Sequence, residues 1–289
     1  MLKLNRKVFF AEVRKGPFPG RLTVDQVSGM TDLLNVWEDM GTDDPRHLAY
    51  CFATNFLETG QKMQPVREGF RKTDASARAY VQRNYGHKGK KWYCWPQGPF
   101  GQVYYGRGDV QLTWYDNYVK MGKILGLPLA KNPDLVLKSA VSKQVLVEGM
   151  LNGASKDGDF TGKSLEDYFN ATKNDPIGAR RIINGTDKAR QIAGYHGEFL
   201  AAIIKAESEY DPDEDDRLDA DTAPVTLPKK NDQTSWGGAI AVLGGLTGTA
   251  SALLDKATPT TVGIIIAVIV VGGFLIARGR KNILNSTGE

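Results

Sequence analysis

Apolar side chains recur at helical spacing in the N-terminal part of the chain and predict three helices. The first follows Asn5, and the second begins at Thr23, whose capping-box partner is Gln26. The third has Asp44 as its N-cap and a proline in its first turn, and it ends before Gly60. The apolar side chains at this spacing in the first two helices are Val8, Phe9, Val13, Val24, Val27, Met30, Leu34 and Trp37. In the third helix we expect Leu48, Cys51, Phe52, Phe56 and Leu57 to point inward.

The middle of the chain has a different pattern. Residues 96–105 are rich in glycine, proline and aromatic side chains, and residues 103–113 alternate around two glycines, which indicates short strands and turns. Helical spacing returns in five later segments, 117–125, 139–150, 165–169, 177–183 and 189–207. The sequence therefore predicts a mainly α (α+β) fold over residues 1–206, a helical globule with a small β-sheet.

The composition changes after residue 206. Nine acidic residues lie between Glu207 and Asp221, and few apolar side chains follow up to residue 235, which predicts a disordered acidic linker over 207–235. Residues 236–289 contain a Gly-rich segment and then an uncharged run of Ile and Val. Since a helix of about 20 residues crosses a bilayer core, we expect a C-terminal transmembrane helix at about residues 260–277.

Charges near the two ends bear on membrane topology. Arg278, Arg280 and Lys281 favour a cytoplasmic C-terminus. The apolar run at residues 8–11 is too short for a signal-peptide core, so no export is expected. A single span would then place the globule outside without a means of export. A hairpin with the Gly-rich segment, or insertion from a virion, would resolve this conflict, and either one predicts association with the host inner membrane or the virion.

Composition and charge exclude several classes of protein. Cys51 and Cys94 are too few for a disulfide framework, and the histidines form no pair at ligand spacing, so no metal site is expected. Residues 1–206 carry 30 Lys and Arg against 21 Asp and Glu, whereas residues 207–289 carry 7 against 12. A basic globule suits an acidic polymer, but without a nucleic-acid-binding signature we expect no nucleic-acid partner.

Two glutamates are candidates for acid and base chemistry. Glu58 ends an otherwise apolar helix, where the helix dipole and an apolar surrounding both disfavour the anion, so the carboxyl would hold its proton as a general acid does. Glu68 follows Arg67 in an irregular segment, which favours its ionised form. One protonated and one charged carboxyl is the arrangement of a glycoside hydrolase. On spacing alone, two solvated surface glutamates are the simpler interpretation.

A third motif changes that balance. Residues 104–114, YYGRGDVQLTW, closely resemble the signature of glycoside hydrolase family 19, the chitinase-like enzymes with a lysozyme-like fold. The segment Glu58-Thr59-Gly60 resembles the catalytic-acid motif of that family, and LGL at 125–127, NPDL at 132–135 and RIING at 181–185 follow in matching order. The resemblance covers roughly residues 5–205 and is closest to bacterial and phage proteins in which a Met-Gln-Pro-Val-Arg-Glu segment follows the first glutamate.

The resemblance implies a small sheet beside a cleft and a role for each matching residue. Glu58 matches the general acid, Glu68 the general base, and Thr113 the hydroxyl that holds the attacking water. The residues expected to contact sugar are Tyr105, Arg107, Gln111, Asn117 and Asn184. Tyr104 is expected in the core and Asp109 on the surface, and Asp74 is the next candidate base if Glu68 lies away from the cleft.

The implied reaction is inverting hydrolysis of a β-1,4 glycosidic bond without a cofactor. Glu58 would protonate the bridging oxygen while Glu68 deprotonates a water, with the carboxyls about 6.5–9.5 Å apart. The basic globule and the membrane segment favour peptidoglycan as partner and a phage-type endolysin or virion-associated muralytic enzyme, working beside other virion or lysis proteins. Two alternatives stay open, a chitinase acting on chitin oligomers and a non-enzymatic, membrane-anchored carbohydrate-binding or virion protein.

Overall fold

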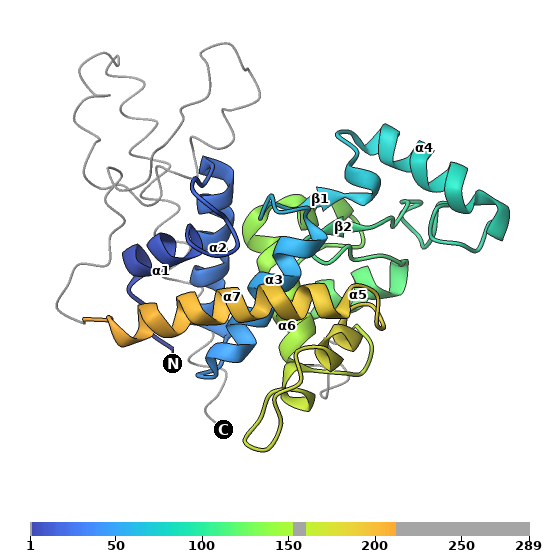
Figure 1. Ribbon diagram of the computed structural model, residues 1–289. Helices are drawn as coiled ribbons and strands as arrows, with labels where there is room; N and C mark the ends of the chain where they lie inside the picture. The colour runs from blue at the N-terminus through green and yellow to red at the C-terminus, as the bar shows by residue number, and fades with distance from the viewer. Residues whose placement is uncertain (1, 153–159, 212–289) are drawn as a thin grey trace, which may run out of the picture. The chain divides into compact units, whose positions relative to one another are not determined.

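The computed structural model describes residues 2–152 and 160–211 (Figure 1). They lie in the first of two units of the chain, Met1–Thr226. Nearly all of the predicted linker, the Gly-rich segment and the predicted transmembrane helix therefore lie outside the described residues. Among the helices within those two ranges, none has the length and apolar character that crossing a bilayer requires.

The described residues are mainly helical, with one two-stranded antiparallel sheet. The α-helices are α1 (Arg6–Val13), α2 (Val24–Met40), α3 (Pro45–Glu58), α4 (Asp74–Tyr85), α5 (Tyr115–Leu125), α6 (Ser139–Leu151) and α7 (Ala189–Ser208). The strands are β1 (Val66–Arg67) and β2 (Arg107–Gly108). Short 3-10 helices are η1 (Glu68–Phe70), η2 (Gly86–Lys88), η3 (Pro133–Leu137), η5 (Leu165–Asp167) and η6 (Gly178–Ile182).

The first three helices begin where their capping residues predict. The Asn5 side chain accepts a hydrogen bond from the Val8 amide at 3.1 Å. Thr23 and Gln26 form both bonds of the capping box, and Asp44 caps α3 ahead of the proline in its first turn. These bonds satisfy amides that would otherwise lack a partner in the first turn, so local sequence sets these boundaries.

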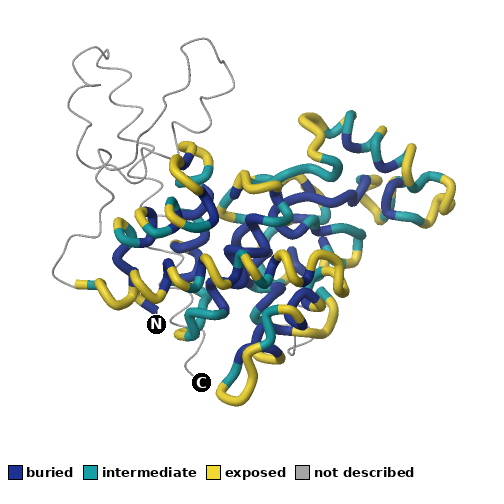
Figure 2. The backbone as a smooth tube through the Cα atoms, viewed as in Figure 1, coloured by how far each residue is buried: buried dark blue, intermediate teal, exposed yellow. Residues whose placement is uncertain are grey.

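Helix α3 is the centre of the main core. Its residues from His47 to Phe56 are all buried, and a helix buried on every side needs neighbours all around it. Helix α7 packs along α3, most of which is coloured as buried in Figure 2. The Phe52 and Phe199 rings stack between the two helices at 5.3 Å. The predicted burial of Cys51 and Tyr104 is confirmed. Because α3 is fixed by this packing, the Glu58 carboxyl at its last residue is held at a defined place.

The sheet joins two segments that are far apart in the chain. Val66 pairs with Gly108, and Arg67 with Arg107. A strand near residues 103–113 was predicted, but its partner β1 was not. Gly108 has a φ of +86°, and a Cβ there would meet the Val136 side chain at 2.7 Å, so a side chain at this position would be both strained and obstructed. The pairing places the start of η1 against the motif segment.

Residues 69–102, called the α4 lobe below, form a second and smaller core with Val103 and Tyr105, which precede β2. Helix α4 buries only Ala77 and Val81, so its apolar periodicity is too weak to predict a helix from sequence. Its buried partners include Tyr93 and Tyr105, and several half-buried aromatic rings pack around them. Two other helices were predicted at residues 165–169 and 177–183. The structure has the shorter 3-10 helices η5 and η6 there.

Candidate active site

The Glu68 carboxylate is held by two hydrogen-bond donors. Oε1 accepts from the Tyr93 hydroxyl at 2.8 Å, and Oε2 accepts from the Gly106 amide at 2.7 Å. The Glu68 amide in turn donates to the Gly106 carbonyl at 2.8 Å. Burial raises the pKa of Tyr93, and the neighbouring Glu68 charge raises it further, so Tyr93 is a neutral donor. Two donors on the half-buried carboxylate fix its orientation.

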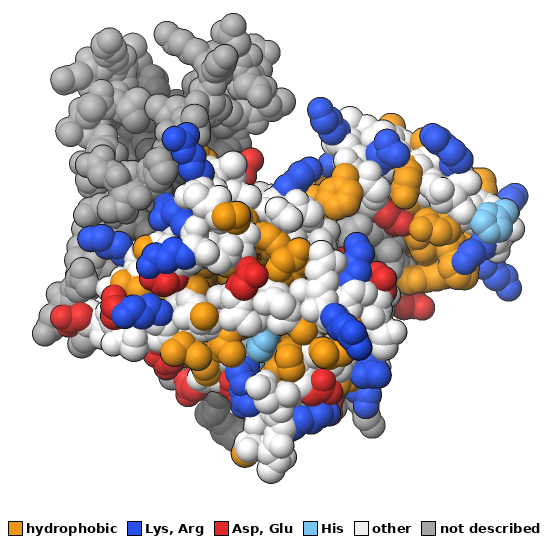
Figure 3. All heavy atoms as spheres, in the orientation of Figure 1, with side chains coloured by type: hydrophobic (Ala, Val, Ile, Leu, Met, Phe, Trp, Pro, Cys, Tyr) orange, Lys and Arg blue, Asp and Glu red, His pale blue; other side chains and the backbone are white. Residues whose placement is uncertain are grey.

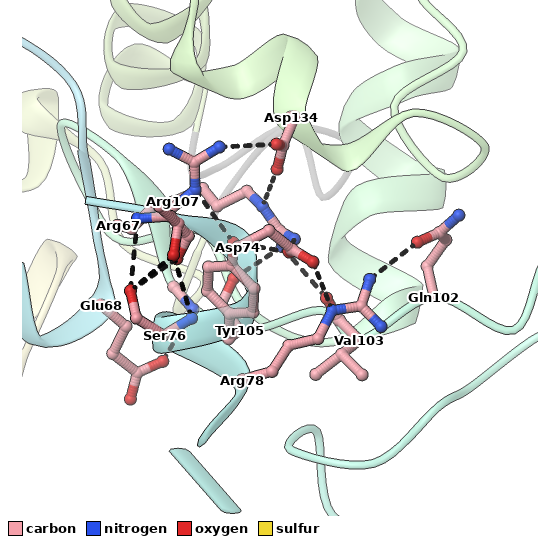
Figure 4. A network of polar contacts seen from close by, with 12 residues as sticks. Arg67, Glu68, Asp74, Ser76, Arg78, Gln102, Val103, Tyr105, Arg107 and Asp134 are labelled. Carbon is pink, nitrogen blue, oxygen red and sulfur yellow. Dashed lines mark hydrogen bonds and ion pairs between the residues drawn. The ribbon is translucent and has the colours of Figure 1, made fainter. Parts of the chain in front are cut away.

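A network of paired charges around the buried Arg107 supports this strand junction (Figure 4). Arg107 donates through Nε to Asp134 at 2.7 Å and through Nη2 to Asp74 at 3.3 Å. Arg67 donates to the second oxygen of Asp134 at 2.6 Å and to the Tyr105 hydroxyl at 3.1 Å. Burial alone would raise the pKa of Asp134, but the hydrogen bonds and charges of the two arginines lower it below its ordinary value. Arg67 on β1 and Arg107 on β2 are therefore both paired with Asp134.

The prediction that Tyr105 and Arg107 line a sugar-binding cleft is wrong for this structure. Both side chains are 0% exposed, so neither offers a surface to a ligand. The Arg107 guanidinium lies 3.6 Å from the centre of the Tyr105 ring, and its remaining donors bond backbone carbonyls and the Tyr118 hydroxyl. Since each nitrogen of the Arg107 guanidinium donates to a protein acceptor, these residues support the β1–β2 junction, to which Glu68 is bonded. The fallback base Asp74 is also committed, because it pairs with Arg78 and Arg107.

Glu58 lies at the end of α3, as predicted, but its surroundings are not purely apolar. Its Oε1 accepts a hydrogen bond from Arg180 Nη1 at 2.6 Å, and the Arg180 side chain is almost completely buried. Arg180 also donates through Nε to the Asp187 carbonyl at 2.9 Å. The carboxyl therefore has a buried charged neighbour. The expectation of a purely apolar surrounding for Glu58 is thereby corrected.

Asp109 is buried, contrary to the prediction that it is exposed. Its carboxylate pairs with Lys143 at 2.8 Å, and both side chains are 0% exposed. Lys143 also donates to the Met63 carbonyl at 2.9 Å, and the Asp109 amide donates to the Ser142 hydroxyl at 2.8 Å. Helix α6 is thereby tied to the motif segment and to the loop that carries Glu68.

Strained backbone conformations concentrate in the segments that carry the candidate residues. Outside glycine, positive φ angles occur in the described ranges at six positions, and the five in these segments are Gln61, Met63, Phe70, Gln111 and Trp114. Such conformations cost about 1–3 kcal/mol each and cluster at functional sites. The two segments that carry the glutamates also touch, because the Phe70 ring packs against Gly60 at 3.2 Å from the place that a Cβ would occupy.

The remaining predicted site residues are Gln111, Asn117, Asn184 and Thr113. The Gln111 amide donates to the Val66 and Gly108 carbonyls at 3.1 Å each, which places it against the Glu68 junction. Asn117 donates to the Thr113 carbonyl at 2.9 Å. Asn184 is exposed and lies beside the Glu58 partner, since its amide donates to the Arg180 carbonyl at 2.9 Å. Among the described residues no hydrogen bond joins Thr113 to either glutamate, so its role stays a prediction.

Sequence reasoning missed three residues of this site: Tyr93, Asp134 and Arg180. Asp134 lies in the matching segment NPDL, and Arg180 precedes the matching segment RIING, so these two motifs were a sequence signal for both residues. No local sequence pattern indicated Tyr93, because its contact with Glu68 depends on the fold of the α4 lobe. A surface pocket of about 420 Å³ lies at the start of α7 and is lined by Arg181, Lys188 and neighbours, but by neither glutamate.

Comparison with known proteins bears on the family. Residues 41–147, which include both glutamates and the motif segment, match the family model described as chitinase class I, glycoside hydrolase family 19. Over these residues the chain resembles glycoside hydrolase family 19. The resemblance predicted from the motifs is thereby confirmed, and the match supports a glycoside hydrolase.

Individual relatives of family 19 match over short segments. An endochitinase of Arabidopsis thaliana is 51% identical over 51 residues, which is 16% of this chain and 18% of the relative. An inactive chitinase-like protein of Hevea brasiliensis is 47% identical over 53 residues, 17% of each chain. The chain thus spans less than a fifth of the length of these relatives.

Solved structures of family 19 chitinases match over a larger share. A bacterial family 19 chitinase has 22% identity, covering 72% of this chain and 98% of its own, with a TM-score of 0.42. Chitinase C of Streptomyces griseus has 26% identity, covering 67% of this chain and 91% of its own, with a TM-score of 0.41. Within the described residues, no group of three or more His, Cys, Asp or Glu side chains is arranged to hold a metal ion.

Proposed function

We propose that the protein hydrolyses β-1,4 glycosidic bonds in a polymer that contains N-acetylglucosamine, with inversion at the anomeric carbon. The observation that carries this proposal is the Glu68 carboxylate, held by Tyr93 and by Gly106 of the family motif. A carboxylate oxygen has two lone pairs, so each Glu68 oxygen can accept a further hydrogen bond from a water. Glu68 is thus equipped to orient a water and remove its proton.

Glu58 is the proposed general acid. Its Oε1 lies 2.6 Å from Arg180 Nη1, so this contact has to loosen if Glu58 is to donate a proton to the bridging oxygen of a bound substrate. Thr113 is the proposed holder of the attacking water, and Gln111, Asn117 and Asn184 are the proposed contacts to acetamido and hydroxyl groups.

For the substrate we propose peptidoglycan, and for the biological role a phage-type endolysin or a virion-associated muralytic enzyme. The support is the excess of Lys and Arg in residues 1–206, 30 against 21 acidic residues, which suits an anionic polymer. Anchoring by a transmembrane helix at about residues 260–277, in the host inner membrane or the virion, is part of the same proposal. It is supported by the uncharged Ile and Val run of that segment.

Two alternatives have specific support. Chitin as substrate is favoured by the matching relatives named endochitinases, such as the Arabidopsis thaliana protein. A non-enzymatic, carbohydrate-binding role is favoured by the similarity to an inactive chitinase-like protein of Hevea brasiliensis. The retention of both glutamates in matching motifs argues for activity.

The test is a digestion of purified peptidoglycan and, separately, of chitin oligomers, with the new ends identified by mass spectrometry. Glu58→Gln keeps the shape of the side chain but has no proton to donate, and we expect a loss of at least about 10²-fold in turnover. Glu68→Gln should show a similar loss. Products from chitin alone would select the chitinase alternative, and no products from either polymer would select the binding role.

A further inference from the structure

The α4 lobe, residues 69–102, concentrates positive charge. It carries seven Lys and Arg residues and one acid, Asp74, so its balance of +6 exceeds the +4 of the whole chain. Asp74 is already paired with Arg78 and Arg107. Figure 3 shows Lys and Arg side chains along the outer surface of this part of the molecule.

Most of these cations have no acidic partner. The six that are exposed are Arg71, Lys72, Arg83, Lys88, Lys90 and Lys91. In residues 2–152 and 160–211, the ion pairs engage none of these six side chains. Like charges gathered at this density repel one another and raise the positive potential over the lobe, so an anionic ligand is attracted to it.

The charged surface is continuous with the Glu68 site. The Arg71 guanidinium lies over the Tyr80 ring at 4.8 Å, and Tyr80 packs against Gly69, next to Glu68. On the other flank, Lys88 lies over the Trp92 ring at 4.3 Å. Trp92 contacts Tyr93, whose hydroxyl binds Glu68. Arg71 and Lys88 are thus connected to the candidate base through short chains of side-chain contacts, and the other exposed cations belong to the same lobe.

We propose that the α4 lobe binds the carboxylates of peptidoglycan stem peptides, which recur along the glycan strand, and thereby selects this polymer over neutral chitin. The inference rests on the proposed function for the position of the glycan, but the binding itself requires no catalysis. Nucleic acid is disfavoured because bases stack on open aromatic faces, whereas the Tyr80, Tyr85 and Trp92 rings of the lobe are covered by its own cations.

The experiment measures binding of the full chain to sacculi from which phosphate polymers have been extracted, in a Glu58→Gln background that prevents digestion. The test variant is Arg83→Glu, Lys90→Glu and Lys91→Glu combined. The matched control is Lys3→Glu, Lys7→Glu and Lys163→Glu, three exposed lysines outside the lobe. At low salt we expect the lobe variant to lose about tenfold or more in affinity and the control to lose less than about twofold.

Two further arms identify the anion. Sacculi whose carboxyls have been amidated should bind the unmutated lobe about as weakly as intact sacculi bind the lobe variant. Affinity for intact sacculi should also fall as salt rises from about 0.05 M to 0.5 M, because exposed charges are screened. Neutral chitin should bind equally to the lobe variant and the control. A glutamine version of each triple variant, with unchanged thermal melting, excludes a folding defect.

Several outcomes would overturn the inference. Equal loss of affinity in the lobe variant and the control would mean that total charge matters and the lobe does not. Unchanged binding to amidated sacculi would exclude carboxylates. Tighter lobe-dependent binding to duplex DNA than to sacculi would assign the surface to nucleic acid. Lobe-dependent binding to sacculi without any hydrolysis by the chain with native Glu58 would refute the proposed function and leave this inference standing.

Discussion

The hydrogen bond from the Tyr93 hydroxyl to Glu68 leads to a prediction that the sequence alone does not give. Tyr93→Phe removes only the hydroxyl, so the ring still packs against Tyr85 and Trp114 while Oε1 of Glu68 loses its donor at 2.8 Å. The Gly106 amide still holds Oε2. The carboxylate should therefore remain in place but with greater freedom of rotation.

The expected magnitude follows from this bond. A hydrogen bond to a charged group contributes about 1.5–3 kcal/mol, and because Glu68 is only half-buried we take the lower end. About 1.5 kcal/mol in the barrier corresponds to roughly a tenfold lower kcat. KM should change little, since Tyr93 orients the base and touches no part of the site where sugar is proposed to bind.

The assay is steady-state hydrolysis of a soluble glycan oligomer, with kcat and KM measured separately. Tyr80→Phe is the control, because it removes a hydroxyl in the same lobe from a ring that packs on Gly69. A Tyr93→Phe enzyme with kcat within about twofold of the unmutated protein, or with the change confined to KM, would refute the positioning role.

Three other predictions concern stability and localisation. Lys143→Met should lower the free energy of unfolding by about 3–5 kcal/mol in urea titrations, because it leaves the buried Asp109 carboxylate without its partner; a cost under about 1 kcal/mol would show that Asp109 is solvated. Burial lowers the pKa of His196 to about 4 from an ordinary 6.5, so the unfolded chain binds the extra proton between these values and stability should fall by about 3 kcal/mol as pH drops through that window. His196→Phe should flatten this dependence, and an unchanged slope would assign it to other groups. Full-length protein should need detergent for extraction while a chain ending at Ser235 should not, and full-length protein that stays in the supernatant would contradict a membrane helix.

The parts of the fold that sequence predicted are those set by neighbouring residues. Asn5, Thr23 and Asp44 cap helices through bonds to amides two or three residues away, so the signal is contained in a short window. Helix α4 and strand β1 were missed because they depend on contacts with residues distant in the chain. Arg67 has a strand partner in Arg107, and no local pattern indicates that pairing.

The site shows the same division. Glu58 and Glu68 were singled out because their motifs are local. Gln111 was predicted from the same motif as a sugar contact, and the structure places its amide against the Val66 and Gly108 carbonyls of the Glu68 junction. Asp109 was misjudged because a charged residue is normally exposed, and its buried partner Lys143 lies 34 residues away. Arg107 was misjudged in a similar way, since the matching motif gives its identity but not the acids that enclose it.

The central claim is that Glu58 and Glu68 act together in a single displacement with a water as the nucleophile. The most direct test is to follow the anomeric proton of the new reducing end by nuclear magnetic resonance during hydrolysis of a β-1,4-linked oligomer, before mutarotation. The account predicts that the α-anomer forms first and that no glycosyl-enzyme accumulates. Initial formation of the β-anomer would mean retention of configuration and would contradict the assignment of Glu68 as a base that activates water.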